Sequence, residues 1–197
     1  MTSLIYFLSL SSAEPISSEV KAPFGLEWGV AKGELKLSYT ECEPAQGIFE
    51  VCKLEQVPKG VSMGSWYSLI YHKEDGLQKI TMVSKDIDND ISGSEGKSMY
   101  NKIKKGLTKK YSKPESYEYI GRKLYKEYDE FYQCLKYEGC GAYASFWNPK
   151  GGGSISLQLK GLTRGLGFVT VVYESKKWTK IIDDLNKKKE SSDEDAF

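Results

Sequence analysis

The sequence predicts an α+β protein in which an antiparallel sheet packs against helices. Residues 154–159 alternate between apolar and polar types, and residues 168–173 are rich in β-branched residues, as expected of strands. Glu74-Asp75-Gly76 separates two further strand-like runs, and Asp-Gly is typical of a tight hairpin turn. Apolar residues recur at helical spacing elsewhere, at Met99, Ile103, Leu107 and Tyr111.

The first half of the chain is expected to hold one short helix followed by strands. The helix begins near Val30 and continues through Leu35. Strand-like runs with many aromatic and β-branched residues follow, at 47–52, 65–71 and 77–83. A polar stretch at 86–96 then leads to the helix with the apolar stripe, for which Ser94 or Ser98 is available as the N-cap.

The second half has a similar order, with helices and then strands. A second helical stripe follows Gly121 and consists of Leu124, Tyr128, Phe131 and Leu135. Strands are expected at 142–147, 154–159 and 168–173. Gly151 to Gly153 predict a flexible hairpin turn between the first two of these strands. Ser175 is expected to cap a final helix, whose apolar face carries Trp178, Ile181, Ile182 and Leu185.

These elements predict a single α+β domain at 14–186, and their order allows two similar lobes at 22–90 and 91–186. No residue-level repeat relates the two halves. With 197 residues and 40% hydrophobic content, the chain is long enough to bury a core. The charged segment 187–197 is expected to be a disordered tail.

The first residues, MTSLIYFLSLSSAEP, have the pattern of a secretory signal peptide. We expect residues 1–13 to be such a signal in truncated form, because no Lys or Arg precedes the apolar core from Leu4 to Leu10. An edge strand or a disordered apolar tail is the alternative. No cysteine follows Ala13, and no later segment is apolar over a bilayer's thickness, so no stable membrane anchor is expected.

The four cysteines form two near-neighbour pairs, Cys42 with Cys52 and Cys134 with Cys140. An even number favours disulfides, although four cysteines allow three pairings that sequence alone leaves open. Zinc binding is the first alternative, but neither spacing is that of a zinc knuckle and the sequence has one histidine. Free thiols in a cytosolic protein are the second. Together with the apolar start, the cysteines predict a periplasmic or secreted location.

The charges of the chain nearly balance. Lys and Arg number 28 against 27 Asp and Glu, which gives a formal net charge of +1. This balance predicts no dominant attraction to nucleic acids or to anionic membrane surfaces. The 14 tyrosines are many for this length. Tyrosines furnish half-buried strand faces, and tyrosine-rich faces also make good protein interfaces, so a protein partner is the expected one.

One stretch, DIDNDISGSEG, partly matches a calcium-binding loop. Asp86, Asp88 and Asp90 stand at its first, third and fifth positions. The sixth and twelfth positions should be Gly and Glu, but Ile91 and Lys97 stand there. A lysine in place of the bidentate carboxylate argues against calcium. A solvated turn that caps the next helix is therefore favoured, and no metal is assigned.

No catalytic or cofactor-binding motif stands out. The glycines after Lys150 lack the spacing of a phosphate-binding loop and lead into a strand rather than a helix. A hydrolase triad would require the single histidine, His72, and no nucleophile motif lies near it. The lysines of the helix after position 98 are typical of the solvent-exposed face of an amphipathic helix. The sequence leaves open whether the protein is an enzyme, with a non-enzyme favoured, and predicts no cofactor.

The segment FGLEWGVAKGELK, from Phe24 to Lys36, resembles the start of many small exported bacterial proteins. It also resembles the helix opening of assembly-lipoprotein and β-lactamase-inhibitor-like folds. The resemblance implies a helical layer on an antiparallel sheet whose exposed face binds another protein. This chain differs in having Gly33 within the predicted helix and no lipidated cysteine. The residues also have a structural explanation, because Phe24, Leu26 and Trp28 can anchor the chain start to the core.

We therefore expect an exported protein-binding module without catalytic activity, such as an inhibitor, an immunity protein or an envelope accessory protein. The alternative is a small hydrolase or a ligand-binding periplasmic protein whose site is assembled from scattered residues. A pocket that gathers His72 with carboxylates would favour this alternative. A flat sheet face rich in Tyr and Trp would favour the binding module.

Overall fold

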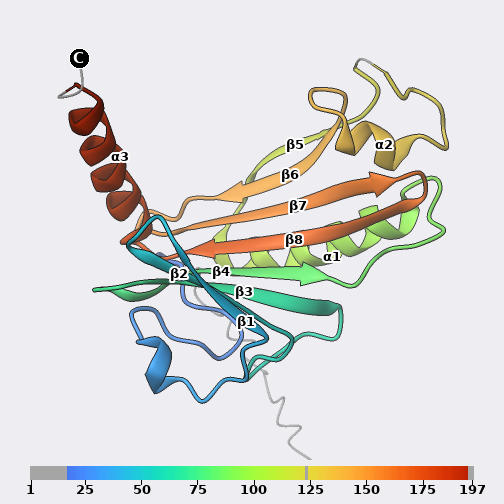
Figure 1. The fold of residues 1–197 in the computed structure, drawn as a ribbon. Helices are drawn as coiled ribbons and strands as arrows, with labels where there is room; N and C mark the ends of the chain where they lie inside the picture. The colour runs from blue at the N-terminus through green and yellow to red at the C-terminus, as the bar shows by residue number, and fades with distance from the viewer. Residues whose placement is uncertain (1–16, 123, 195–197) are drawn as a thin grey trace, which may run out of the picture.

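The computed structural model describes residues 17–122 and 124–194, which form one eight-stranded antiparallel sheet and three α-helices (Figure 1). The strands are β1 (Glu41–Ala45), β2 (Phe49–Leu54), β3 (Gly64–His72), β4 (Gly76–Ser84), β5 (Glu115–Tyr119), β6 (Ala142–Trp147), β7 (Ser154–Thr163) and β8 (Leu166–Glu174). The helices are α1 (Ser94–Tyr111), α2 (Phe131–Lys136) and α3 (Trp178–Glu194). The predicted α+β class and its antiparallel sheet are confirmed.

The strand order in the sheet is β1-β2-β3-β4-β8-β7-β6-β5. Strands β1 to β4 therefore lie side by side in chain order, and β5 to β8 do the same in the opposite direction. The two sets meet where β4 pairs with β8, with Ile80 opposite Tyr173 and Val83 opposite Thr170. Because the hydrogen-bonded sheet is continuous across this seam, the structure does not confirm a division into two lobes.

One face of the sheet, here called the core face, carries the hydrophobic core. Alternate residues of β3, β7 and β8 point into it and are buried, as the period of a strand requires. Helices α1 and α2 cover this face over the second half of the sheet (Figure 1), and buried Tyr100 and Phe131 contact Tyr143 of β6. The segment before β1 covers the first half, where the ring of Phe24 contacts Tyr67 and Tyr173.

The predicted hairpin at Asp75-Gly76 is present between β3 and β4. Gly76 has a φ of 65°, and a Cβ there would lie 2.2 Å from the carbonyl oxygen of Gly29. The N–H of Gly29 also donates to the carbonyl oxygen of Leu77, at 2.9 Å. Glycine is thus required twice at this turn, by its backbone angle and by the close approach of the segment that precedes β1.

Three expected helical features differ from the structure. The helix expected from Val30 to Leu35 is a single 3₁₀ turn at Lys32–Glu34. The stripe after Gly121 becomes helical only at α2, because Gly121 and Tyr125 both have positive φ values that an α-helix cannot contain. The final helix α3 continues to Glu194 and so extends into the range 187–197, which was expected to be disordered. Its lysines and glutamates are good helix formers.

The N-cap of α1 also differs from the expectation. Neither Ser94 nor Ser98 occupies the cap position, which belongs to Gly93. The carboxylate of Asp90 instead accepts a hydrogen bond from the N–H of Gly96, at 2.9 Å. A side chain three residues before the cap position therefore binds one of the free N–H groups at the start of the helix.

The glycine turn between β6 and β7 is held by the first described residues. The N–H of Gly151 donates to the carbonyl oxygen of Ser18, and the N–H of Val20 donates to that of Gly152, at 2.5 and 3.0 Å. A Cβ at Gly151 would lie 2.3 Å from the carbonyl oxygen of Ser18. The glycines of this turn thus allow a second backbone to approach, a role that differs from the flexible tip expected from the sequence.

Candidate functional site

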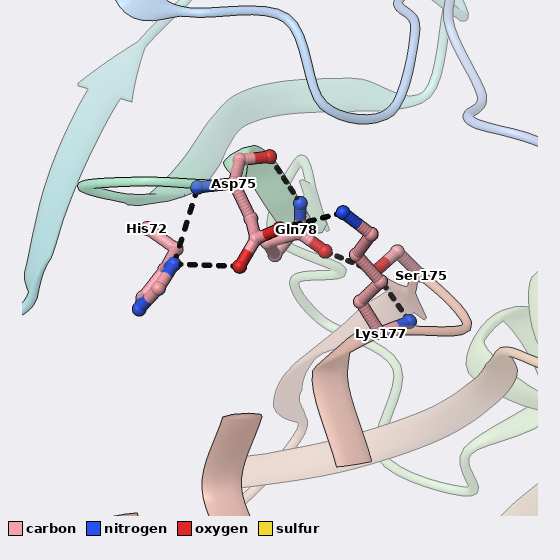
Figure 2. Close-up of polar contacts among 5 residues, drawn as sticks. All are labelled: His72, Asp75, Gln78, Ser175 and Lys177. Carbon is pink, nitrogen blue, oxygen red and sulfur yellow. Dashed lines mark hydrogen bonds and ion pairs between the residues drawn. The ribbon is translucent and has the colours of Figure 1, made fainter. Parts of the chain in front are cut away.

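The single histidine lies in a polar cluster between the β3–β4 turn and the start of α3 (Figure 2). His72 Nδ1 lies 3.0 Å from Asp75 Oδ2, and the N–H of Asp75 donates to the same nitrogen at 3.2 Å. The two contacts share one nitrogen, so Nδ1 donates to the carboxylate when it carries a proton and accepts from the amide when it does not. The His72 side chain is 12% exposed.

Asp75 links the turn to α3. Its Oδ1 lies 2.6 Å from Nζ of Lys177, which is 102 residues further along the chain. This ammonium group, with a smaller contribution from His72, holds the pKa of the Asp75 carboxyl below its ordinary value. The carboxylate therefore stays ionised at neutral pH and bridges His72 and Lys177.

Two buried polar residues, Gln78 and Ser175, connect the β3–β4 turn to the segment before α3. Gln78 is 1% exposed, and its Nε2 donates to the carbonyl oxygen of Asp75 at 2.5 Å. The hydroxyl group of buried Ser175 donates to Oε1 of Gln78, and the Ser175 N–H donates to the Gln78 carbonyl oxygen at 2.9 Å. Ser175 Oγ also accepts from the N–H of Lys177, at 3.2 Å. Because α3 begins at Trp178, this contact lies in the turn just before the helix, and the expectation that Ser175 caps α3 stays a prediction.

A groove of about 460 Å³ runs between α3 and the β3–β4 turn beside this cluster. Its apolar lining comes from Ile48, Ile181 and Leu185. Its charged lining consists of Glu74, Asp75, Lys177, Lys180, Asp184 and Lys188, together with His72. The groove therefore gathers the histidine with three carboxylates, and its volume suits a small ligand or one or two side chains of a partner.

The cluster contains the parts of a His–Asp pair but no assembled hydrolase triad. The Ser175 hydroxyl is bonded to Gln78 and not to the imidazole. Figure 2 shows Nε2 of His72 directed away from the other four residues, so this nitrogen is the one that could meet a ligand or a water molecule. With Asp75 orienting Nδ1, such an imidazole can accept a proton or a hydrogen bond at Nε2.

The opposite face of the sheet, here called the open face, has an uncharged centre. The register of five strands shows which side chains lie next to one another on this face. One row of neighbours is Ser68, Thr81, Val172, Ser156 and Phe146, and the next is Trp66, Val83, Thr170, Gln158 and Ala144. Apart from the buried Val83 these side chains are half-buried. In the described part of the chain, no layer covers them as the helices cover the core face.

Charged and aromatic residues surround this centre. The ammonium group of Lys53 lies 4.9 Å above the ring of Trp66 at one side. At the opposite side, Tyr117 on β5 is 48% exposed and its ring contacts Phe146. The end nearest α3 carries the ion pair of Lys79 with Glu174, at 2.8 Å. The open face therefore consists of two neutral rows with mostly small and β-branched residues in the middle and the rings of Trp66 and Phe146 at their ends, bordered by charged residues and Tyr117.

The first residue of helix α3 packs at one end of the open face. The ring of Trp178 packs against Phe49 at 5.3 Å between centroids, and Nζ of Lys79 lies 4.8 Å above the same indole. Phe49 is the register partner of His72. The groove and the open face are therefore neighbouring parts of one surface, and α3 lines the groove and then projects beyond the end of the sheet (Figure 1).

All four cysteines are in disulfides, Cys42 with Cys52 and Cys134 with Cys140. The first links register partners on β1 and β2, and the second connects α2 to the turn that follows it. In the described ranges, one group is arranged to hold a metal ion, and it consists of Cys42, Glu50 and Cys52. Because its two sulfurs are bonded to each other, they offer no thiolate to a metal.

The three aspartates of the partial calcium loop do not converge in the described structure. Asp90 is 4% exposed and points inward, toward the start of α1 and the hydroxyl group of Tyr132. Asp86 and Asp88 are exposed, and the Asp88 carboxylate accepts the N–H of Asn89 at 2.8 Å. Asp90 therefore has a structural role in joining two helices, which the sequence pattern did not indicate.

The sequence contained a signal for the open face. Strand β8 has core-face residues Val169, Val171 and Tyr173, but its other side carries Phe168, Thr170 and Val172 rather than charges. A strand with uncharged side chains on both faces is expected to be covered on both faces, by the rest of the chain or by a partner. The sequence held no comparable signal for the cluster of Gln78, Ser175 and Lys177, because only the fold brings these residues together.

Comparisons with known proteins returned no match: no family model, no curated protein and no solved structure corresponds to this chain. The fold and the site define a disulfide-bonded α+β protein with an eight-stranded antiparallel sheet. Two disulfides are typical of extracellular proteins. Within the described ranges, no helix has both the length and the apolar character that crossing a bilayer requires. The resemblance of Phe24 to Lys36 to exported bacterial proteins remains a prediction.

Proposed function

We propose that this chain is an exported protein-binding module without catalytic activity, and that its open face binds the partner. The neutral centre of the open face, within its rim of aromatic and charged residues, is the observation that carries the proposal. Protein interfaces have this anatomy, since charged residues are depleted at their cores and rings are enriched. A free protein gains little from two uncharged rows on a solvent-facing sheet surface.

The chemistry of the open face indicates what kind of partner it fits. Its centre offers hydroxyl groups, methyl groups and one amide, which suit a surface of mixed polarity. Its rim holds rings at both sides, Trp66 and Tyr117, and large rings commonly anchor protein partners. The two disulfides support an exported location, periplasmic or secreted. An inhibitor, an immunity protein or an envelope accessory protein would all act by such binding.

The test is affinity capture from the envelope fraction of the native cell, with the captured protein identified by mass spectrometry. Thr170→Arg and Ser156→Arg place a charge in the centre of the open face and should abolish capture. Asn101→Arg adds the same charge to the exposed side of α1 and should leave capture intact. Chemical unfolding of all three variants separates lost binding from lost folding. Equal capture by folded Thr170→Arg and wild-type protein would exclude this face.

The proposed location has its own test. Protein isolated from the native cell under alkylating conditions should carry no free thiol, since all four cysteines are paired here. Free thiols on all four would contradict an exported protein, because the cytosol keeps most thiols reduced. Mass spectrometry of the isolated N-terminus would also establish whether residues 1–13 are removed, as expected of a signal peptide.

One observation favours the alternative, a small hydrolase or a ligand-binding periplasmic protein. The groove gathers His72 with Glu74, Asp75 and Asp184, and Nε2 of the imidazole is the atom available to a ligand. A screen of small molecules for thermal stabilisation tests it. Stabilisation that disappears in His72→Gln, combined with no captured protein partner, would favour this function over the binding module.

A further inference from the structure

We propose that β5 pairs with β5 of a second copy of this chain, antiparallel and about a two-fold axis at Tyr117. This inference is independent of the proposed function, because it concerns the chain alone. Strand β5 is an edge of the sheet and is hydrogen bonded to β6 on one side. Four of its five residues are exposed, so its outer row of backbone groups faces solvent in the described structure.

The other edge of the sheet is protected in a way that β5 is not. Strand β1 contains Pro44, which has no N–H to donate. The adjacent Cys42 is bonded to Cys52 on the next strand, which holds β1 against β2. Strand β5 contains no proline, and its only flanking proline is Pro114, just before it. The two edges therefore differ in their capacity to add a strand, and β5 is the available one.

The sequence of β5 favours a self-paired register centred on Tyr117. With Tyr117 opposite itself on the axis, Glu115 lies opposite Tyr119 and Ser116 opposite Glu118, so all five residues are paired. No two carboxylates face each other in this register. A shift by one residue in one direction places Glu115 opposite Glu118, and a shift by two in the other direction places Glu118 opposite itself; every shift also leaves fewer than five residues paired. Like charges directly opposite one another destabilise a strand pair.

Both glutamates of β5 have hydrogen-bond partners within their own copy. Glu118 lies 2.5 Å from Nζ of Lys104 and accepts the hydroxyl group of Tyr100 at 3.1 Å. Glu115 accepts a hydrogen bond from the hydroxyl group of Tyr117. In the centred register the uncharged Ser116 stands opposite Glu118 of the other copy, once on each side of the axis, so no like charges meet there.

The strand is also held rigidly, which lowers the entropy lost on pairing. The hydroxyl group of Ser116 lies 2.8 Å from that of Ser145 on β6, and Ser145 lies 2.6 Å from the hydroxyl group of Tyr100 on α1. Ser145 and Tyr100 are fully buried. Hydrogen bonds through the core thus fix the position of β5, and a preorganised edge binds with a smaller entropic cost.

Pairing would join the two open faces side by side, because Tyr117 and its neighbour Ala144 belong to that face. The contact is small, since one five-residue strand from each copy supplies it. Interfaces of this size are weak and transient, so association should appear at high protein concentration. The expected species is a symmetric dimer in which the two open faces lie side by side.

The experiment is sedimentation of the purified full chain alone, from about 10 µM to about 1 mM. A monomer–dimer equilibrium is expected for wild-type protein. Tyr117→Lys and Tyr117→Glu each place like charges opposite one another on the axis, and each should weaken association about fivefold or more. An equimolar mixture of the two variants should associate again, because Lys then faces Glu. Tyr128→Lys, at a 79% exposed position outside β5, is the matched control.

Three outcomes would overturn the proposal. The first is wild-type protein that stays monomeric at the highest concentration. The second is a dimer that Tyr117→Lys does not weaken or that the mixed variants do not restore, which would place the contact elsewhere. The third is amide hydrogen exchange of β5 that does not change with protein concentration, since pairing should slow this exchange as the concentration rises. Slow exchange that does not depend on concentration would mean that another part of the same chain covers this edge.

Discussion

The hydroxyl group of Tyr132 donates a hydrogen bond of 2.7 Å to the carboxylate of Asp90, 42 residues earlier in the chain. Both side chains are buried. The same carboxylate accepts the N–H of Gly96 at 2.9 Å and the hydroxyl group of Ser94 at 3.1 Å. One ionised side chain therefore accepts hydrogen bonds from the first turn of α1 and from Tyr132 of α2. The two helices on the core face are thus connected by a polar contact as well as by packing.

Replacing Asp90 is expected to lower the free energy of unfolding substantially. Asp90→Ala removes the hydrogen bonds that this carboxylate accepts and leaves the buried hydroxyl group of Tyr132 without its acceptor, a loss of about 2–4 kcal/mol. Asp88→Ala is the matched control, because Asp88 is exposed and should cost less than about 0.5 kcal/mol. Urea unfolding measures both. Equal stability of the two variants would contradict this role of Asp90.

The same carboxylate predicts a dependence of stability on pH. Burial raises the pKa of Asp90, but the hydrogen bonds from Gly96, Tyr132, Glu95 and Ser94 outweigh it, so the pKa lies below its ordinary value. The stabilisation is therefore complete above the unfolded-state pKa, about 4, and is lost as the pH falls through the lower folded-state pKa. Unfolding measured from pH 6 downward should show a shallower fall in Asp90→Asn than in wild-type protein.

A methyl group at Gly161 should be far more harmful than one at Gly33. A Cβ on Gly161 would lie 1.8 Å from the carbonyl oxygen of Tyr132, and backbone on both sides leaves little room to move. Gly161→Ala should therefore cost about 3 kcal/mol in unfolding free energy. A Cβ on Gly33 would have no neighbour within 4 Å, so Gly33→Ala should change stability by less than about 0.5 kcal/mol. Similar unfolding midpoints would contradict the close contact of α2 with β7.

Trp178 is expected to hold α3 against the open face. Trp178→Ala removes the packing on Phe49 and the contact with Lys79, at a cost of about 1–3 kcal/mol. Amide hydrogen exchange should become faster throughout α3 while the core strands stay protected. Thr179→Ala, one residue further along and exposed, should leave exchange unchanged. Unaltered exchange of α3 in Trp178→Ala would show that other contacts hold the helix.

The disulfide of Cys134 with Cys140 should stabilise the region around α2. Replacing both cysteines with alanine opens a short loop of sequence separation 6, and the chain-entropy model expects a loss of about 2–3 kcal/mol. The α2 amides should then exchange faster than those of β1 and β2, which keep their own disulfide. Unchanged stability of this double variant relative to oxidised wild-type protein would contradict the prediction.

Much of the secondary structure could be predicted from local sequence. Residues 142–147 were expected to be a strand and are β6, and the Asp75-Gly76 hairpin lies between β3 and β4 as expected. These assignments depend on side-chain alternation and turn chemistry, which act over a few residues. Strands β1 and β5 were not predicted, because neither has a buried alternating face. Each is a strand because its neighbour supplies hydrogen bonds, which the sequence of the strand itself does not reveal.

The candidate site was less predictable than the fold. His72 was considered as an isolated histidine, and its Asp75 partner lies three residues away, within reach of sequence reasoning. Lys177 joins them from 102 residues beyond Asp75, and Gln78 meets Ser175 across 97 residues. The aspartates at 86, 88 and 90 were considered together because of their spacing. Burial separates them, since the fold turns one carboxylate inward and leaves the other two in solvent.

The sequence by itself determined the α+β class, the even set of cysteines and the balance of charge, because each follows from composition or from patterns of a few residues. The pairing of β4 with β8, the cysteine partners and the uncharged centre of the open face were decided by the tertiary structure. These features join residues that are distant in the chain. Burial and hydrogen bonding select them only when the whole sheet forms.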